Sequence, residues 1–207
     1  STGRLGRPVF VARAAGRPAT GRGWTQGSAP QYSYRMAGDV QIHYLDDDGL
    51  IPNNAERPLI VYPGEMTGLE AADDPAALFE HRFAAHGWTG SWRNGVFPYH
   101  HYHSNTHEVL GCYSGSATVQ LGGESGISVE MRPGDVVVIP AGVGHKRLSS
   151  GRVGIVGAYP DGRAPDMNYG KGEERERAIA AIRGVPVPEH DPVRGADGPL
   201  PGLYRGD

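Results

Sequence analysis

Residues 100–108 read HHYHSNTHE, and this stretch decides how the rest of the chain is interpreted. It holds four of the chain's nine histidines and ends in Glu108. Side chains two residues apart share one face of a β-strand. If residues 97–103 form a strand, His101 and His103 therefore project together, while the residues between and beside them point the other way. The pattern favours a pair of metal ligands over a histidine-rich surface turn.

Two further residues complete a candidate metal site. The loop SNTH returns the chain, so Glu108 begins the next strand and can face the same interior. His145 follows the stretch PAGVG and begins another strand, where a side chain can point inward. Imidazole nitrogens and a carboxylate suit a borderline divalent metal such as Fe, Mn, Ni or Zn. We therefore predict one divalent transition metal held by His101, His103, Glu108 and His145.

Short β-strands dominate the chain from residue 40 onward. VQIHYL (40–45) and LIVY (59–62) have strand character, and turn-forming sequences such as GGESG and RPGD separate the later segments. The later strands are expected near 97–103, 108–113, 117–121, 127–131, 135–139, 145–148 and 153–158. Short strands at regular spacing predict an all-β sandwich or barrel.

Two helices are expected beside the strands. The first covers 74–86, where Asp74 can cap the helix and Pro75 can occupy its first turn. The second lies around 173–184, in the sequence EERERAIAAIRG. Both are expected at the periphery of the barrel.

Extensions flank the predicted barrel on both sides. Residues 1–38 are rich in Arg, Gly and Pro, contain no acidic residue and show no clear period, so we expect a flexible arm. Residues 39–160 are assigned to the barrel domain. Residues 161–207 should form the C-terminal helix and a tail too rich in Pro and Gly for further regular structure.

The composition excludes several classes of function. The formal net charge is −3, with no basic patch beyond the N-terminus, so we expect no nucleic-acid partner. Apolar runs are far too short for a membrane span, and we expect no membrane partner. The single cysteine suits a reducing compartment, which favours a cytoplasmic location. Motifs of P-loop proteins, serine hydrolases and dinucleotide-binding proteins are absent.

Two motifs give the chain a resemblance to a known family. The first motif is carried by Gly95, His101, His103, Glu108 and Gly115. The second is carried by Gly134, Pro140, Gly142 and His145, with Ser149 where the motif ends in Asn. In this order and spacing they resemble the cupin superfamily. From about residue 46 to 205, stretches such as GWTGSWRNG and DPVRGADGPL are similar to small bacterial YjlB-type cupins.

The resemblance implies a fold and a site. It implies an antiparallel cupin (jelly-roll) barrel with one or two peripheral helices and extended N- and C-terminal arms. It also implies that the metal is held by His101, His103, Glu108 and His145. Barrels of this kind often pair through their sheets, so we expect a homodimer.

Six residues are candidates for the wall of a substrate pocket: Phe97, Tyr99, Leu110, Cys112, Trp92 and Arg93. Phe97 and Tyr99 share the inward phase of the ligand histidines, and the Trp-Arg pair is expected in a loop beside the motif. For each of them packing in the core, or simple stacking, is the competing interpretation, above all for Cys112. His100 and His107 are out of phase with the ligands, and we expect them to face solvent or to support the ligands from outside.

Two classes of function remain open. In the first, the protein is a metalloenzyme for a small oxygen-bearing organic substrate, with dioxygenase- or isomerase-type chemistry as in similar cupins. In the second, the barrel binds a small ligand without turnover, and the metal is structural or anchors the ligand. A general acid or base inside the barrel, besides the ligands, would discriminate between them, and strand phase alone identifies none.

Overall fold

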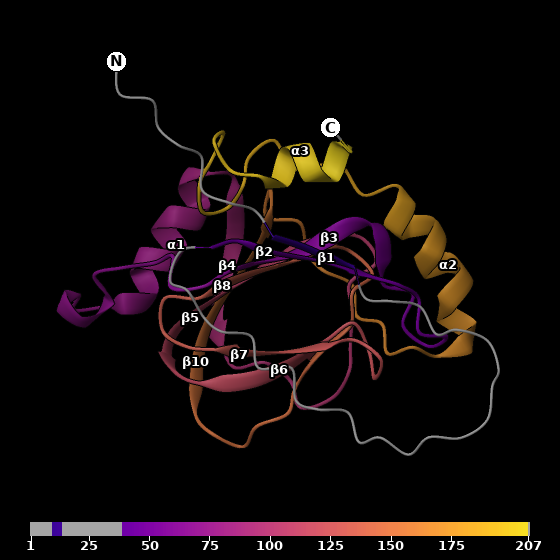
Figure 1. Ribbon diagram of the computed structural model, residues 1–207, viewed down its shortest axis with the longest axis horizontal. Helices are drawn as coiled ribbons and strands as arrows, with labels where there is room; N and C mark the ends of the chain where they lie inside the picture. Colours follow the sequence, from indigo (N-terminus) through magenta and orange to yellow (C-terminus); the bar gives the residue numbers. More distant parts are fainter. Residues whose placement is uncertain (1–9, 14–38, 207) are drawn as a thin grey trace.

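The computed structural model describes residues 10–13 and 39–206. Two facing sheets form the body of the molecule (Figure 1). The larger sheet contains, in spatial order, β1 (Phe10–Arg13), β2 (Gln41–Leu45), β3 (Asn54–Tyr62), β8 (Val136–Ile139), β5 (Glu108–Gly115), β10 (Val153–Pro160) and β4 (Trp88–Asn94). The smaller contains β7 (Ile127–Met131), β6 (Ala117–Leu121) and β9 (His145–Arg147). The expected jelly-roll barrel is confirmed.

Among the described strands, the pairing is antiparallel except between β1 and β2. The prediction of a flexible arm over 1–38 falls mainly outside the described residues. Its one described segment, β1, pairs with β2 in parallel, although the sequence there shows no clear period. The division into an arm, a barrel domain and a tail stays a prediction.

The central strand β5 is buried on both faces because its side chains alternate. Leu110 and Cys112 pack with the apolar residues between the two sheets. Val109 points the other way, into a second apolar cluster on the outer face of the larger sheet. This alternation directs Glu108, at the start of β5, toward the interior of the barrel.

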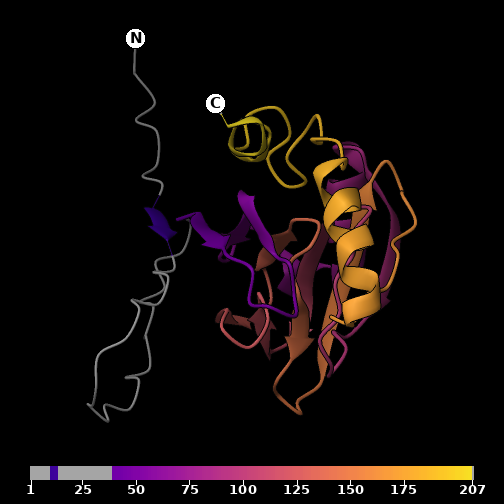
Figure 2. The ribbon, with the colours of Figure 1, turned by 90° about the vertical axis from the view of Figure 1, so that its right-hand side faces the viewer.

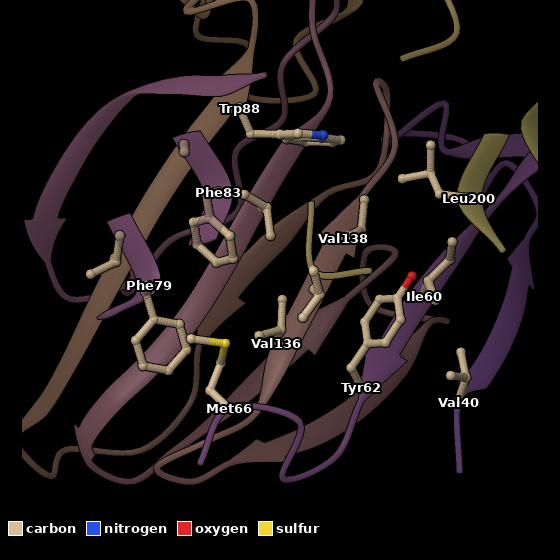
Figure 3. Packing of buried hydrophobic residues seen from close by; sticks show 14 of the residues in the cluster. Val40, Ile60, Tyr62, Met66, Phe79, Phe83, Trp88, Val136, Val138 and Leu200 are labelled. Atoms are coloured by element: carbon tan, nitrogen blue, oxygen red, sulfur yellow. The ribbon is translucent and has the colours of Figure 1, made fainter. Parts of the chain in front are cut away.

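The described helices are η1 (Leu69–Ala71), α1 (Pro75–Ala85), α2 (Gly172–Arg183) and α3 (Leu200–Arg205). α1, α3 and the C-terminal segment cover the outer face of the larger sheet, whereas α2 lies beside the barrel (Figures 1 and 2). Figure 3 shows Phe79 and Phe83 of α1, Trp88 of β4 and Leu200 of α3 in one buried apolar cluster. None of the helices in the described part of the chain has the length and apolar character needed to cross a membrane.

The two predicted helices are present. Asp74 caps α1 by accepting a hydrogen bond from the backbone N–H of Ala77 at 3.3 Å, and Pro75 is the first helical residue. The helix predicted over 173–184 corresponds to α2. The local sequence was sufficient to predict these helices. At α1, for example, a capping residue directly precedes a run of residues compatible with a helix.

Three predictions of local structure were wrong. Residues 97–103 do not form a strand, since only isolated bridges at His101 and Tyr102 occur there. The segment bends at Pro98, which has no N–H to donate to a ladder. Trp92 and Arg93, expected in a loop, lie on β4, which pairs with β10 at the edge of the sheet.

The third wrong prediction concerns the tail, which contains the helix α3. Leu200 and Tyr204, four residues apart, are both buried against the larger sheet. Packing of these two side chains stabilises a helix although the local sequence favours turns. Buried Asp191 fixes the segment that precedes α3. Its carboxylate accepts hydrogen bonds from the hydroxyl of Tyr62 and from the backbone N–H groups of Val193 and Arg194.

Gly111 lies where α1 comes closest to β5. A Cβ atom at this position would lie 2.2 Å from Cδ1 of Phe79, a distance that forces a neighbour to move. The glycine therefore permits the helix to lie directly on the strand that carries Glu108.

We predict that Gly111→Ala lowers the free energy of unfolding by about 1–3 kcal/mol, because the added methyl displaces the buried ring of Phe79. Chemical denaturation measures the effect. Gly172→Ala is the control, since a Cβ atom there meets nothing within 4 Å. Phe79→Leu should recover part of the loss in the Gly111→Ala background. Wild-type stability of Gly111→Ala would show that the approach is not close.

Candidate metal centre

Hydrogen bonds between the two motif segments bring the candidate ligands together. His101 and His145 form an antiparallel bridge, in which His145 N–H donates to the carbonyl of His101 at 2.9 Å and the reverse bond measures 3.3 Å. The N–H of Gly142 donates to the carbonyl of His103 at 2.8 Å. Glu108 follows on β5 and pairs with Ile139 of β8. Backbone pairing, rather than a continuous strand, therefore positions the histidines.

The side chains of the four residues converge in a buried space. Metal-ligating atoms of His101, His103 and His145 all lie within 4.8 Å of one another. Glu108 Oε2 lies 3.4 Å from Nε2 of His103 and 3.3 Å from Nε2 of His145. All four residues are at most 6 % exposed. The geometry thus brings together every ligand predicted from the sequence.

The hydrogen bonds of the rings leave Nε2 available on each histidine. Nδ1 of His101 faces the carbonyl of Tyr99 at 3.3 Å, and Nδ1 of His145 faces the carbonyl of Val143 at 3.3 Å. Nδ1 of His103 contacts the carbonyl of Asp166. A carbonyl only accepts, so each Nδ1 carries a hydrogen, and each ring in its neutral form presents a lone pair at Nε2.

The ionisable groups of the site influence one another. Burial, followed by the neighbouring rings of His145 and His103, lowers the pKa of His101 to about 3. Burial acts to lower the pKa of His103, but the charge of Glu108 outweighs it and the pKa is raised. Burial acts to raise the pKa of Glu108, but His103 and His145 outweigh it and the pKa is lowered. Glu108 is therefore a carboxylate, and a proton on His103 can balance its charge.

This donor set suits a divalent metal ion. Glu108 Oε2 is buried and has no hydrogen-bond partner among the described residues. Its distances of 3.3 and 3.4 Å to two Nε2 atoms resemble the roughly 3.0–3.4 Å that separates neighbouring ligands at metal–ligand distances of about 2.1 Å. Lone pairs and a carboxylate that face each other in a buried space repel unless a positive charge lies between them. His101, His103, Glu108 and His145 would hold that charge.

The segment 164–168 supports the ligand loop from outside. The carboxylate of Asp166 accepts hydrogen bonds from the backbone N–H of Ser104 at 2.7 Å and from the Ser104 hydroxyl. Tyr102 forms a backbone bridge with Asn168. These contacts hold His103 between two anchored neighbours, so its ring direction does not depend on the metal.

A cavity of about 280 Å³ opens in front of the four residues. Apolar side chains form much of its wall, among them Val96, Leu110 and Met167. Arg93, Asn94 and Tyr159 are its additional polar lining residues. The hydroxyl of Tyr159 accepts a hydrogen bond from Nε1 of Trp92 at 2.8 Å. Tyr159 is 7 % exposed. The site therefore combines a polar floor with a largely apolar wall.

The candidate pocket residues divide into two groups. Trp92, Arg93, Phe97 and Leu110 line the cavity. Tyr99 and Cys112 are not among the lining residues, so these two predictions were wrong. Tyr99 stacks on Phe97 with ring centroids 5.0 Å apart and is 43 % exposed, because the chain bends outward after Pro98. Cys112 lies further along β5, in the apolar cluster between the sheets.

The remaining histidines of the quoted stretch are not part of the cluster. His100 lies on the other side of the loop, with Nε2 3.3 Å from a carboxylate oxygen of Glu124. His107 does not face solvent, as one expectation had it. It is fully buried, and its Nδ1 accepts a hydrogen bond from the backbone N–H of Ala141 at 3.0 Å. It thereby fixes the turn that precedes His145.

Sequence reasoning missed Tyr159, Asp166 and Met167. They lie within or after β10, outside both motifs, and only the fold brings them to the site. The alternation of β10 offered one signal for Tyr159, since its side chain shares a face with Gly157 and Ile155, and Ile155 belongs to the interior cluster.

Comparison with known proteins agrees with this geometry. Residues 92–151 match the family described as the Cupin domain. YjlB of Bacillus subtilis (strain 168), itself uncharacterized, is 45 % identical over 166 residues, which cover 80 % of this chain and 96 % of that protein. The chain belongs to the YjlB family of cupins. The resemblance inferred from the two motifs is thus confirmed, and this cupin carries a three-histidine cluster suited to a metal ion.

Solved structures similar to this cupin include proteins of different kinds. Acireductone dioxygenase from Bacillus anthracis, with a cadmium ion in its active center, is 19 % identical with a TM-score of 0.37, and the match covers 63 % of this cupin and 83 % of that chain. Procruciferin, an 11S globulin from Brassica napus, is 22 % identical with a TM-score of 0.31. That match covers 38 % of this cupin and only 21 % of the globulin.

We predict that His101→Ala, His103→Ala or His145→Ala lowers the affinity for a divalent metal by more than about 100-fold, since outer partners of ligands alone contribute about 10–100-fold. His100→Ala is the matched control from the same loop and should keep wild-type affinity. Metal content and metal titration of the purified variants measure the difference. Equal retention by all four variants would contradict the assignment.

A second prediction concerns pH. The metal has to displace the proton from His103, whose pKa is raised above 6.5, so affinity should fall as pH drops through that pKa, by about tenfold per unit for one proton. His101, with a pKa of about 3, is already neutral and adds nothing near neutral pH. Metal titrations from about pH 8 to 4.5 test this. Constant affinity over that range would argue against ligation by histidine.

Proposed function

We propose that this cupin is a metalloenzyme that acts on a small oxygen-bearing organic substrate, by dioxygenase- or isomerase-type chemistry. The observation that carries the proposal is the cavity in front of the ligands. It places a hydrogen-bonding hydroxyl, that of Tyr159, beside a metal site that opens to a largely apolar pocket. A purely structural metal site is usually closed by its protein ligands.

The number of ligands leaves room for a substrate. Three histidines and one glutamate fill four positions, so a six-coordinate ion keeps about two for exchange. Such an ion, when bound, acts as a Lewis acid toward oxygen ligands or as a site for dioxygen. The cavity of about 280 Å³ limits the substrate to a small molecule.

The wall of the cavity selects the carbon skeleton. Val96, Phe97, Leu110 and Met167 offer apolar surface. Phe97 and Met167 are 44 % and 38 % exposed, so they lie at the mouth rather than in the core. A substrate would place its oxygens toward the histidines and its carbon atoms against these side chains.

Tyr159 is the group that strand phase alone did not identify. Burial raises the pKa of its hydroxyl, and the carboxylate of Glu108 raises it further, so Tyr159 keeps its proton throughout the neutral range. Trp92 donates to the hydroxyl oxygen and thereby orients it. The single hydrogen of the hydroxyl faces the carboxylate of Glu108, so a substrate oxygen would compete with that carboxylate for it. Tyr159 is therefore a candidate donor to a substrate oxygen and is unsuited to act as a base.

A non-catalytic cupin that binds a small ligand remains the second candidate function. The four ligands and the apolar wall would serve a binding protein equally well. Tyr159 is the residue that can discriminate between the two, since an enzyme would use its donor during turnover and a binding protein only to orient the ligand.

We predict that protein loaded anaerobically with Fe(II) changes its absorption spectrum with bidentate oxygen ligands such as catechols or keto acids, and that some of them prompt oxygen uptake. Tyr159→Phe should keep the spectral change but lower oxygen uptake at least about tenfold, because it removes one oriented donor. Tyr44→Phe, on β2 and away from the cavity, is the control.

The outcomes separate the two candidate functions. Spectral changes without uptake or conversion of any ligand would favour the binding protein. A spectrum that no ligand changes would indicate a closed site and contradict both. Two further expectations join the proposal: a cytoplasmic location and a homodimer, the latter measurable by light scattering.

A further inference from the structure

A second hollow adjoins the metal cavity and carries two arginines. It has a volume of about 600 Å³ and shares residues 94–97 with the wall of the metal cavity. Arg147 and Arg152 line it, together with the hydroxyls of Ser114 and Ser150, and no Asp or Glu is among its lining residues. We call this hollow the arginine groove. It is positively charged in a chain whose formal net charge is −3.

Arg147 faces the interior of the barrel. It lies two residues after His145 on β9, so both side chains occupy one face of the strand. On the neighbouring strand β6, Leu121 pairs with His145 and Val119 pairs with Arg147. Val119 and Leu121 both belong to the apolar cluster between the sheets. The guanidinium therefore leaves the sheet on the same side as a candidate metal ligand.

This guanidinium is poorly satisfied within the described part of the chain. Its Nε is buried and makes no hydrogen bond there, and NH1 makes one long bond of 3.3 Å to the carbonyl of Gly151. No described carboxylate forms an ion pair with it.

The buried Nε of Arg147 costs stability because it has no partner among the described residues. The NH1 end of the guanidinium is exposed, so an anion can reach it. The planar fork of an arginine matches a carboxylate through two parallel hydrogen bonds. The inward guanidinium of Arg147 can balance one negative charge. Arg152, which is exposed and also lines the groove, attracts the same anion electrostatically.

We propose that the arginine groove binds a carboxylate of the substrate, so that the substrate is an organic acid with a metal-binding oxygen at one end and this carboxylate at the other. The inference rests on the proposed function and names its substrate class. His145 and Arg147 are two residues apart on one strand, so their Cα atoms are separated by about 6.6 Å. The metal-binding oxygen and the distant carboxylate of the substrate should be separated by a similar distance. Arg147 holds the distant carboxylate, and the metal ligands face the other end.

The arginine groove and the metal cavity meet at residues 94–97, and Gly95, which has no side chain, lines both hollows. A Cβ atom at Gly95 would lie 3.7 Å from NH1 of Arg147, so the guanidinium reaches the wall that the two hollows share. A substrate that reaches both sites has to pass this wall beside Gly95, where no side chain stands in the way.

Two keto acids that chelate a metal identically test the proposal. 2-Oxoglutarate carries a distant carboxylate and 2-oxobutanoate does not. With metal-loaded protein we expect 2-oxoglutarate to bind at least about tenfold more tightly, as for one charge-assisted pair. Arg147→Met should reduce that ratio to about one and leave the affinity for 2-oxobutanoate unchanged. Arg132→Met, an exposed arginine paired with Glu130, is the matched control and should keep the ratio.

Thermal unfolding of metal-free protein gives an independent readout. Glutarate should raise the melting temperature of the wild type and of Arg132→Met, but not that of Arg147→Met. Without ligand, Arg147→Met should be as stable as the wild type or more so, because it replaces an unpaired charge by an apolar chain. Arg147→Lys, which keeps the charge, should retain part of the glutarate effect and shows that the position tolerates substitution.

The outcomes distinguish this proposal from the proposed function. If neither keto acid changes the metal's spectrum while glutarate still stabilises the protein through Arg147, the enzyme fails and the carboxylate site stands. If both keto acids bind equally well and glutarate has no effect, the carboxylate site is overturned and the metal site stands. A marked loss of stability in Arg147→Met without any anion effect would assign the residue a structural role and overturn the proposal.

Discussion

Burial of both faces of β5 is the constraint on which the rest of the structure depends. A strand with two covered faces cannot shift its register by one residue without exchanging its inner and outer side chains. Glu108 therefore has to face the interior when Val109 packs under the helices. The outer apolar cluster, with α1 lying directly on Gly111, thus fixes the direction of a carboxylate on the opposite side of the sheet.

The metal site also depends on carbonyl groups that are not ligands. Three different carbonyls face Nδ1 of the three histidines, two from nearby in the chain and one from Asp166, more than sixty residues from His103. Each contact selects the tautomer that presents Nε2 to the cavity. The arrangement is prepared by the backbone, so the ligands need little rearrangement to hold an ion.

The sequence was most informative where one motif fixes both spacing and chemistry. His101, His103, Glu108 and His145 could be assigned because period-two alternation and motif spacing agreed, and the helix at Asp74 because a cap and a proline coincide. The reasoning for His101 and His103 was partly wrong, since the strand predicted around them is broken at Pro98. Their common direction survives because bridges to β9 and to residue 168 replace the missing ladder.

Residues that act across long distances in the chain could not be predicted in the same way. Tyr159 and Asp166 reach the site through tertiary packing, and neither lies in a stretch with a local signature. The sequence did not decide whether Cys112 lines the cavity or packs in the core, because side chains of both kinds point to the inside of the barrel. Leu110 lies in the cavity wall and Cys112 lies two residues further along β5, in the core. How far along the strand the cavity ends is decided by the assembled barrel.

The C-terminal segment has a consequence for the order in which the protein folds during synthesis. Val193, Leu200 and Tyr204 belong to the outer apolar cluster, and Trp88 donates to the carbonyl of His190. Both strand-rich motifs leave the ribosome long before these residues do. Until residues 193–204 have been synthesised, the nascent barrel exposes the apolar face that α3 later covers, and such exposed surface favours aggregation. A stop codon between residues 160 and 190 would spare every candidate metal ligand and still yield a chain prone to aggregation.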